Sequence, residues 1–269
     1  MTETEKGRRP TWAEPCFRFM DYLFQVDDLI TLTDEGITYL TKVPRILELA
    51  HTALHPEKNE KDNETENRAK KRAELAKSEI AKDFPLLHSH AIMGIWGALE
   101  AMIEDLAISW IEHNPSVLSE PKIAKIRIPL IEFQAMDQQG RLRFIVSELQ
   151  RELGTELKSG ANKFESLLSL LGLGGPVDKR LKDIIFETQN LRNIFAHRGG
   201  IADRKFVTNC PQFQYAVGDT VRIDTQHYNR IFFGFLMYAA VILNRCRTID
   251  NLDPITDEFP GFEGVLSTP

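Results

Sequence analysis

The feature that most restricts the fold is one long apolar stretch near the middle of the chain. Residues 86–115 read LLHSHAIMGIWGALEAMIEDLAISWIEHNP, and Pro115 closes the stretch. Its apolar side chains recur at the spacing of an α-helix, and a proline is a usual place for a helix to end. The stretch therefore predicts one long, buried helix, which needs other helices as packing partners.

Other parts of the chain carry the same helical periodicity. Pro44 predicts a break or kink, and Pro176 with Gly199-Gly200 marks the two ends of another helix. The segments with this pattern are 15–30, 33–54, 141–160, 163–175, 175–197 and 226 to about 248. We therefore expect an all-α protein with a helical core from about Phe84 to Thr248.

Only one segment has a β-like pattern. Within residues 205–225, Phe206–Thr208 and Val221–Ile223 are rich in apolar and β-branched residues, and Gly218-Asp219 is a turn signal. These features predict a short β-hairpin just before the last helix.

The charged segment 57–83 separates an N-terminal part from this core. It holds eight basic and eight acidic side chains, so its net charge is zero. So little apolar surface predicts a mobile loop that leads into a solvated helix. We expect three regions: an N-terminal helical extension (1–83), a helical domain (84–250) and a C-terminal tail (251–269).

Composition restricts the compartment and the kind of site. The three cysteines have no CxxC or Cys/His spacing, which predicts reduced thiols and neither disulfides nor structural zinc. The first residues contain no apolar run typical of a secretion signal. The longest apolar run, Ile231–Leu243, has 13 residues, whereas a membrane span needs about 20. We therefore expect a cytoplasmic protein with no membrane-spanning helix.

The end of the segment 175–197 carries the strongest candidate site. Gln189, Asn193 and His197 follow one another at a spacing of four, which makes a polar ridge on a helix. Arg192 falls roughly 140° around the helix from His197. A straight helix then aims the two side chains apart, so we expect either an unwound last turn at Gly199 or a second copy that completes the site. The face expected to be buried contains Leu181, Ile184, Ile185, Leu191, Ile194, Phe195 and Ala196.

Two interpretations of this helix end stay open on the residues alone. Arg192, His197 and Arg198 suit the negative end of the helix dipole, and Gly199-Gly200 is an ordinary helix stop. In this interpretation the polar residues are caps. In the other, they hold and cut a phosphodiester.

The motif LRNIFAH, residues 191–197, resembles the signature of the HEPN domain family, in which an Arg, a polar residue and a His end a core helix. The long helix with WGALEAMIEDL resembles the N-terminal core helix of the same family. The continuation AHRGGIADRKF, a ribbon at VGDTVRI and the closing apolar helix resemble a subset of its bacterial members, over roughly residues 84–248. This resemblance implies a HEPN-like helical bundle. Some members carry a Tyr two residues after the His, whereas here that position is Gly199.

The resemblance implies a metal-independent endoribonuclease, and the angle between Arg192 and His197 predicts that its site lies at a dimer interface. Arg192, Asn193 and His197 would be catalytic, and Arg198, Arg204 and Lys205 would bind RNA. The expected partners are RNA and a second copy of the chain, without metal or cofactor. A role in phage defence or in a toxin–antitoxin pair, with an antitoxin or another partner protein, stays open. The alternative is a non-catalytic HEPN module that binds RNA, a nucleotide or a protein.

Residues 178–205 hold seven Lys or Arg against four acids, within a chain whose net charge is −6. This local excess of positive charge is consistent with a polyanion partner. A solvated helix face explains part of it equally well.

Other residue groups are weaker candidates. His88 and His90, with Glu100 or Glu104, could be imagined as metal ligands, but positions i and i+2 point apart on a helix. The turn 172–176, GLGGP, precedes a helix and lacks the Lys and Ser/Thr of a phosphate-binding loop, so we expect a connector. Glu100, Glu104 or Asp105 could pair with Arg192, although an exposed face is the simpler expectation.

Overall fold

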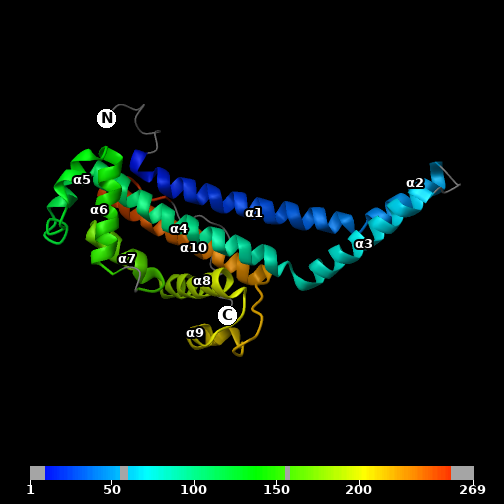
Figure 1. Cartoon of the computed structure of the whole chain (residues 1–269). Coiled ribbons are helices and arrows are strands. Elements are labelled where there is room, and N and C mark those ends of the chain that lie inside the picture. Colours follow the sequence, from blue (N-terminus) through cyan, green and yellow to red (C-terminus); the bar gives the residue numbers. More distant parts are fainter. Residues whose placement is uncertain (1–9, 55–59, 155–157, 256–269) are drawn as a thin grey trace. The chain divides into compact units, whose positions relative to one another are not determined.

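The computed structural model describes residues 10–54, 60–154 and 158–255 (Figure 1). Over these residues the chain forms ten α-helices and three short 3-10 helices, and no strand. The α-helices are α1 (Glu14–Leu40), α2 (Val43–Leu54), α3 (Glu60–Lys82), α4 (Pro85–His113), α5 (Leu130–Ala135), α6 (Gln138–Glu152), α7 (Ala161–Leu170), α8 (Lys179–Arg198), α9 (Arg204–Asn209) and α10 (Thr225–Ile249). The all-α expectation is confirmed.

The described residues form two compact units. The first, unit 1, contains the described residues up to Leu23, Ile92–Val221 and the described residues from Asn229 onward. The second, unit 2, contains Phe24–Ala91 and Arg222–Tyr228. Helices α1, α4 and α10 therefore each contribute residues to both units.

Large aromatic residues fill the core of unit 1. The ring of Trp96 on α4 lies 5.6 Å from that of Phe164 on α7 and 6.3 Å from that of Phe235 on α10. These contacts agree with the side-by-side course of α4 and α10 in Figure 1. Trp12 and Trp110 meet edge to face at 5.5 Å, so the 3-10 helix Thr11–Ala13 packs onto the end of α4.

Helix α8, which ends at the candidate site, is held against α10 by a close approach at Gly234. A Cβ atom added at Gly234 would lie 2.8 Å from Cγ2 of Ile184. Only glycine permits this spacing without a shift of the neighbour, because a buried β-branched side chain has little freedom to move. The crossing fixes the position of α8 in unit 1.

Unit 2 is built on a stripe of small residues. Ala69, Ala73 and Ala76 are the buried residues of α3, and α3 packs against α2. At the other end of the unit, the buried ring of His88 stacks on Tyr228 at 5.3 Å. Burial of Tyr228, with Asp27 nearby, raises the pKa of its phenol.

The predicted helices are present, but some boundaries differ: α1 continues past the expected segment 15–30 to Leu40, and α6 ends at Glu152 within the expected segment 141–160. The break expected at Pro44 falls between the end of α1 at Leu40 and the start of α2 at Val43. The long central helix ends at His113, two residues before Pro115. Part of segment 57–83 forms α3, whereas residues 55–59 and the tail from residue 256 lie outside the described residues.

The β-hairpin is not confirmed among the described residues. Phe206–Thr208, expected as its first strand, lies inside α9, because the Asp203 side chain accepts a hydrogen bond from Phe206 N and starts a helix there. Val221–Ile223 forms no strand either. A single antiparallel bridge joins Ile201 to Thr220.

One described helix, α10, is long and apolar enough to cross a membrane by length and composition alone. Of its most apolar 18-residue window, 61% is buried inside the structure. A core helix of a globular protein passes the same test, so this property does not distinguish a membrane span from a core helix.

The three cysteine thiols are expected to be inert in the folded protein. Cys16, Cys210 and Cys246 are all buried and free. Burial raises the pKa of Cys210 and of Cys246 to about 12, and that of Cys16 further. Because the thiolate is the nucleophile, a disulfide reagent at pH 8 should label no cysteine in the native protein and three after denaturation. Rapid labelling of the native protein would contradict this burial.

Candidate functional site

Helix α8 has a capped start and a closed end. The Asp178 side chain accepts a hydrogen bond from Arg180 N at the N-terminus. At the other end Gly199 adopts a left-handed conformation, with φ of 59°, and Gly200 N donates to Ile194 O. Backbone donors thus reach Ile194 O and Arg198 O, and the His197 ring contacts Arg192 and no carbonyl of the helix end.

The buried face of α8 agrees with the sequence pattern except in the last turn. Phe195 is only half buried and Ala196 is exposed, although both were expected in the core. The last turn therefore leaves the core and carries its side chains into solvent. The expected core residues that are buried are Leu181, Ile184, Ile185, Leu191 and Ile194.

The predicted catalytic residues meet within one chain. Arg192 Nη1 lies 3.3 Å from His197 Nε2 and 3.3 Å from Asn193 Oδ1. His197 is exposed, whereas Arg192 and Asn193 are half buried. A cation, an amide and an imidazole thus share one partly open corner of the molecule.

This contact defines the hydrogen-bonding state of the imidazole. A guanidinium has donors only, so Nε2 of His197 must be the acceptor from Arg192. The proton of the neutral ring is then on Nδ1. The one in-plane lone pair of Nε2 therefore points at Arg192 Nη1.

The expectation that a straight helix keeps Arg192 and His197 apart is wrong. The helix runs without interruption to Arg198, and the last turn does not unwind. Their Cα atoms do differ in direction by roughly 140°, but the long, flexible Arg192 side chain curves along the helix to reach the ring. A second copy of the chain is not required to bring the two groups together.

The three predicted RNA-binding cations are exposed, but one of them is partly neutralised. Arg198 Nε lies 3.9 Å from Asp203 Oδ2, whereas Arg204 and Lys205 begin α9 with exposed side chains. Two further cations of the stretch 178–205 also have acidic partners, in the pairs Lys179–Asp183 and Arg180–Asp178. The positive surface is therefore smaller than the sequence count indicates.

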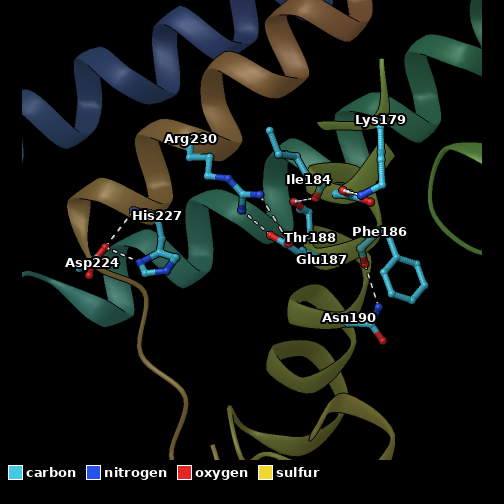
Figure 2. Close-up of polar contacts among 10 residues, drawn as sticks. Lys179, Ile184, Phe186, Glu187, Thr188, Asn190, Asp224, His227 and Arg230 are labelled. Atoms are coloured by element: carbon cyan, nitrogen blue, oxygen red, sulfur yellow. Dashed lines mark hydrogen bonds and ion pairs between the residues drawn. The ribbon is translucent and has the colours of Figure 1, made fainter. Parts of the chain in front are cut away.

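A largely buried ion pair on α8 was not predicted from the sequence. Both Nη atoms of Arg230, on α10, donate to the carboxylate of Glu187, on α8 (Figure 2). Glu187 is buried. The signal was present in the sequence, because Glu187 falls inside the apolar arc of α8 and a buried carboxylate requires a partner.

Two amides of α8 also have structural roles. Asn190 donates to Phe186 O (Figure 2) and accepts from Asn209 Nδ2 at 2.8 Å, which ties α9 to α8. Gln189, expected on the same polar ridge as His197, accepts from Gly160 N at 2.6 Å. Gln189 therefore joins the loop before α7 to α8, and this contact gives it a scaffold role.

The weaker candidates are placed elsewhere. His88 is buried with Nδ1 3.0 Å from Ile223 O, while His90 is exposed. Glu100 pairs with Lys163, and Asp105 pairs with Arg18, so neither of these two ion pairs involves Arg192. Among the described residues no cluster of three or more His, Cys, Asp or Glu could hold a metal.

The turn 172–176 behaves as a connector. Arg245 Nη1 donates to Leu173 O and Arg245 Nη2 donates to Pro176 O, so carbonyl oxygens of the turn are held by α10.

A cleft of about 790 Å³ lies in unit 1 among α4, α6 and α7. None of its lining residues belongs to the predicted site.

Comparison of the chain with protein-family models, with curated proteins and with solved structures finds no match.

Proposed function

We propose that the protein is a metal-independent endoribonuclease, of HEPN-like fold, that cleaves RNA at the C-terminal end of α8. The observation that carries this proposal is the contact of Arg192 with both His197 and Asn193 at an exposed helix end. The three residues form the Arg–polar–His pattern that resembles the HEPN signature. The His197 ring also makes no hydrogen bond to a carbonyl of the helix end, which leaves it available to a ligand.

The chemistry begins with proton transfer from the ribose. Nε2 of His197 takes the proton of the 2′-OH as its oxygen forms a bond to phosphorus. The bond from phosphorus to the 5′ oxygen then breaks, and that oxygen takes a proton from solvent. The products are a 2′,3′-cyclic phosphate and a 5′-OH. Because the nucleophile is the 2′-OH, DNA cannot react in this way.

Arg192 stabilises the charge that accumulates on the phosphate oxygens. Its planar fork fits two oxygens at once, and a move of Nη1 from the imidazole to the phosphate would release the lone pair of Nε2. Asn193 Oδ1 holds the guanidinium close to this position. The contact between Arg192 and His197 thus keeps Nε2 unprotonated until an anion binds.

The remaining parts of the proposal concern context. We place the protein in the cytoplasm, with RNA as its partner and a role in phage defence or a toxin–antitoxin pair. Each protomer has its own Arg192–His197 contact, so a homodimer would contain two sites. The competing function is a non-catalytic module that binds RNA, a nucleotide or a protein, and the test below separates the two.

A matched pair of oligonucleotides tests the reaction. Purified protein should cleave total RNA in excess EDTA, and the mapped cut should carry a 2′,3′-cyclic phosphate. An oligonucleotide with a single 2′-deoxy residue 5′ to that cut should stay intact there, because it has no nucleophile. Loss of cleavage in EDTA, or cutting at the 2′-deoxy position, would contradict the mechanism. Binding of RNA without any cleavage would favour the non-catalytic module.

A further inference from the structure

Unit 2 exposes an unusual amount of apolar surface. Of the fifteen large hydrophobic residues exposed among the described residues, nine lie in this unit, on α1, α2, α3 and the first turn of α4. Scattered exposed residues need no explanation, whereas a contiguous apolar patch marks an interaction site. The arrangement of these residues on their helices therefore matters.

On α1 the exposed residues form a regular seam. Leu29, Leu32, Gly36 and Tyr39 follow one another at spacings of three, four and three, the pattern of the core positions of a coiled coil. Leu32 is 66% exposed and Tyr39 57%. A Cβ added at Gly36 would meet nothing within 4 Å, so the seam has a hole at its centre.

This seam is acidic along one flank. Asp28 and Glu35 each precede a seam residue and are exposed, so they line the same side of the helix. From Phe19 to Thr41 the sequence contains five Asp or Glu and no Lys or Arg. Two α1 helices would therefore repel each other across this surface, and the partner of the seam must be basic.

A complementary surface is present on α3 of the same unit. Leu75 is 65% exposed and lies roughly 130° around the helix from the buried alanine stripe. Lys71 and Arg72, four and three residues before it, share its face. From Arg68 to Lys77 the sequence holds five basic residues and one acid. The patch is thus one exposed leucine, Leu75, surrounded by basic side chains.

We infer that unit 2 is a self-association surface, on which the basic patch around Leu75 of one copy packs onto the acidic α1 seam of a second copy. Leu75 would fill the hole at Gly36, as a knob fills a hole between coiled-coil helices. A two-fold axis makes the contact reciprocal, because the seam of the second copy then receives the patch of the first. Two such contacts bring together two acidic and two basic surfaces.

This interface does not depend on the proposed nuclease activity, and it differs from a pairing through α8. Its ion pairs are exposed, so association weakens with salt as the Debye length falls from about 10 Å at 0.1 M to about 3 Å at 1 M. The apolar seam and knob give the contact its salt-independent part.

Light scattering of the full chain at micromolar concentration tests the inference. We expect the wild type to have twice the mass of one chain, which is 30.7 kDa. Leu75→Glu and Leu32→Glu should each raise the dissociation constant at least tenfold, about the effect of losing a central interface residue. Leu130→Glu is the matched control, since Leu130 on α5 is also 65% exposed, and it should keep the wild-type mass. Circular dichroism checks that each variant is folded.

A charge exchange identifies the occupant of the seam. Glu35→Lys alone and Lys71→Glu alone should each weaken the dimer, because each puts like charges opposite each other. The two together in one chain should restore it, and only a second copy of this chain predicts that result. A wild-type mass of one chain at every salt concentration, or no restoration by the double variant, would overturn the inference.

Discussion

His197→Ala is expected to lower the rate of RNA cleavage by about 10²–10⁴-fold, the usual contribution of a general acid or base. The ring is exposed and its nitrogen contacts only Arg192 in the described structure, so its loss should leave the thermal unfolding midpoint unchanged. The measurement is the single-turnover rate with protein in excess over a labelled RNA. His90→Ala, which removes an exposed histidine of α4, is the control and should cleave at the wild-type rate.

Arg192 allows a sharper version of the same prediction. Arg192→Ala should lower the rate of RNA cleavage about 10²–10³-fold, the effect of losing one hydrogen-bond donor to a charged transition state. Arg192→Lys should recover only part of this loss, because an ammonium is a point charge without the planar fork. The double variant with His197→Ala should be little slower than the slower single variant, since residues that act as a unit are not additive. Additive losses would mean that the two side chains act separately.

The sequence predicted the helices better than it predicted the contacts between them. Periodicity located α4 and α10, because a long apolar helix repeats one simple signal many times. Phe206–Thr208 forms a helix and not the predicted strand, because three residues carry too little periodicity to outweigh the helix start made by Asp203. In short segments a single cap decides the structure.

At the site, residue identity was predictable but geometry was not. The direction of a Cα atom on the helix does not fix where Arg192 ends, because a long side chain can reach along the helix. Gln189 looked equivalent to His197 on the polar ridge until Gly160, 29 residues away, was seen to bind it. Such long-range partners leave no local pattern in a single sequence.

Arg230→Met is expected to lower the free energy of unfolding of unit 1 by about 3–5 kcal/mol, the cost of leaving one charge of a buried pair alone. The Glu187 side chain is 9% exposed and that of Arg230 20%. Glu187→Leu should therefore cost less, since the remaining guanidinium reaches water more easily. Urea unfolding can be followed by fluorescence, because the three tryptophans (Trp12, Trp96 and Trp110) all belong to unit 1.

The double variant Glu187→Leu with Arg230→Met separates the cost of breaking the pair from its net contribution. Nε of Arg230 is buried without a hydrogen bond among the described residues, so the ion pair does not satisfy every polar atom that it buries. We therefore expect the double variant to unfold within about 1 kcal/mol of the wild type, because two apolar side chains need no partners. Asp183→Ala, which removes an exposed ion pair of α8, should change stability by less than about 1 kcal/mol and controls for charge on the same helix. A double variant as unstable as Arg230→Met would show instead that the pair itself stabilises the crossing of α8 and α10.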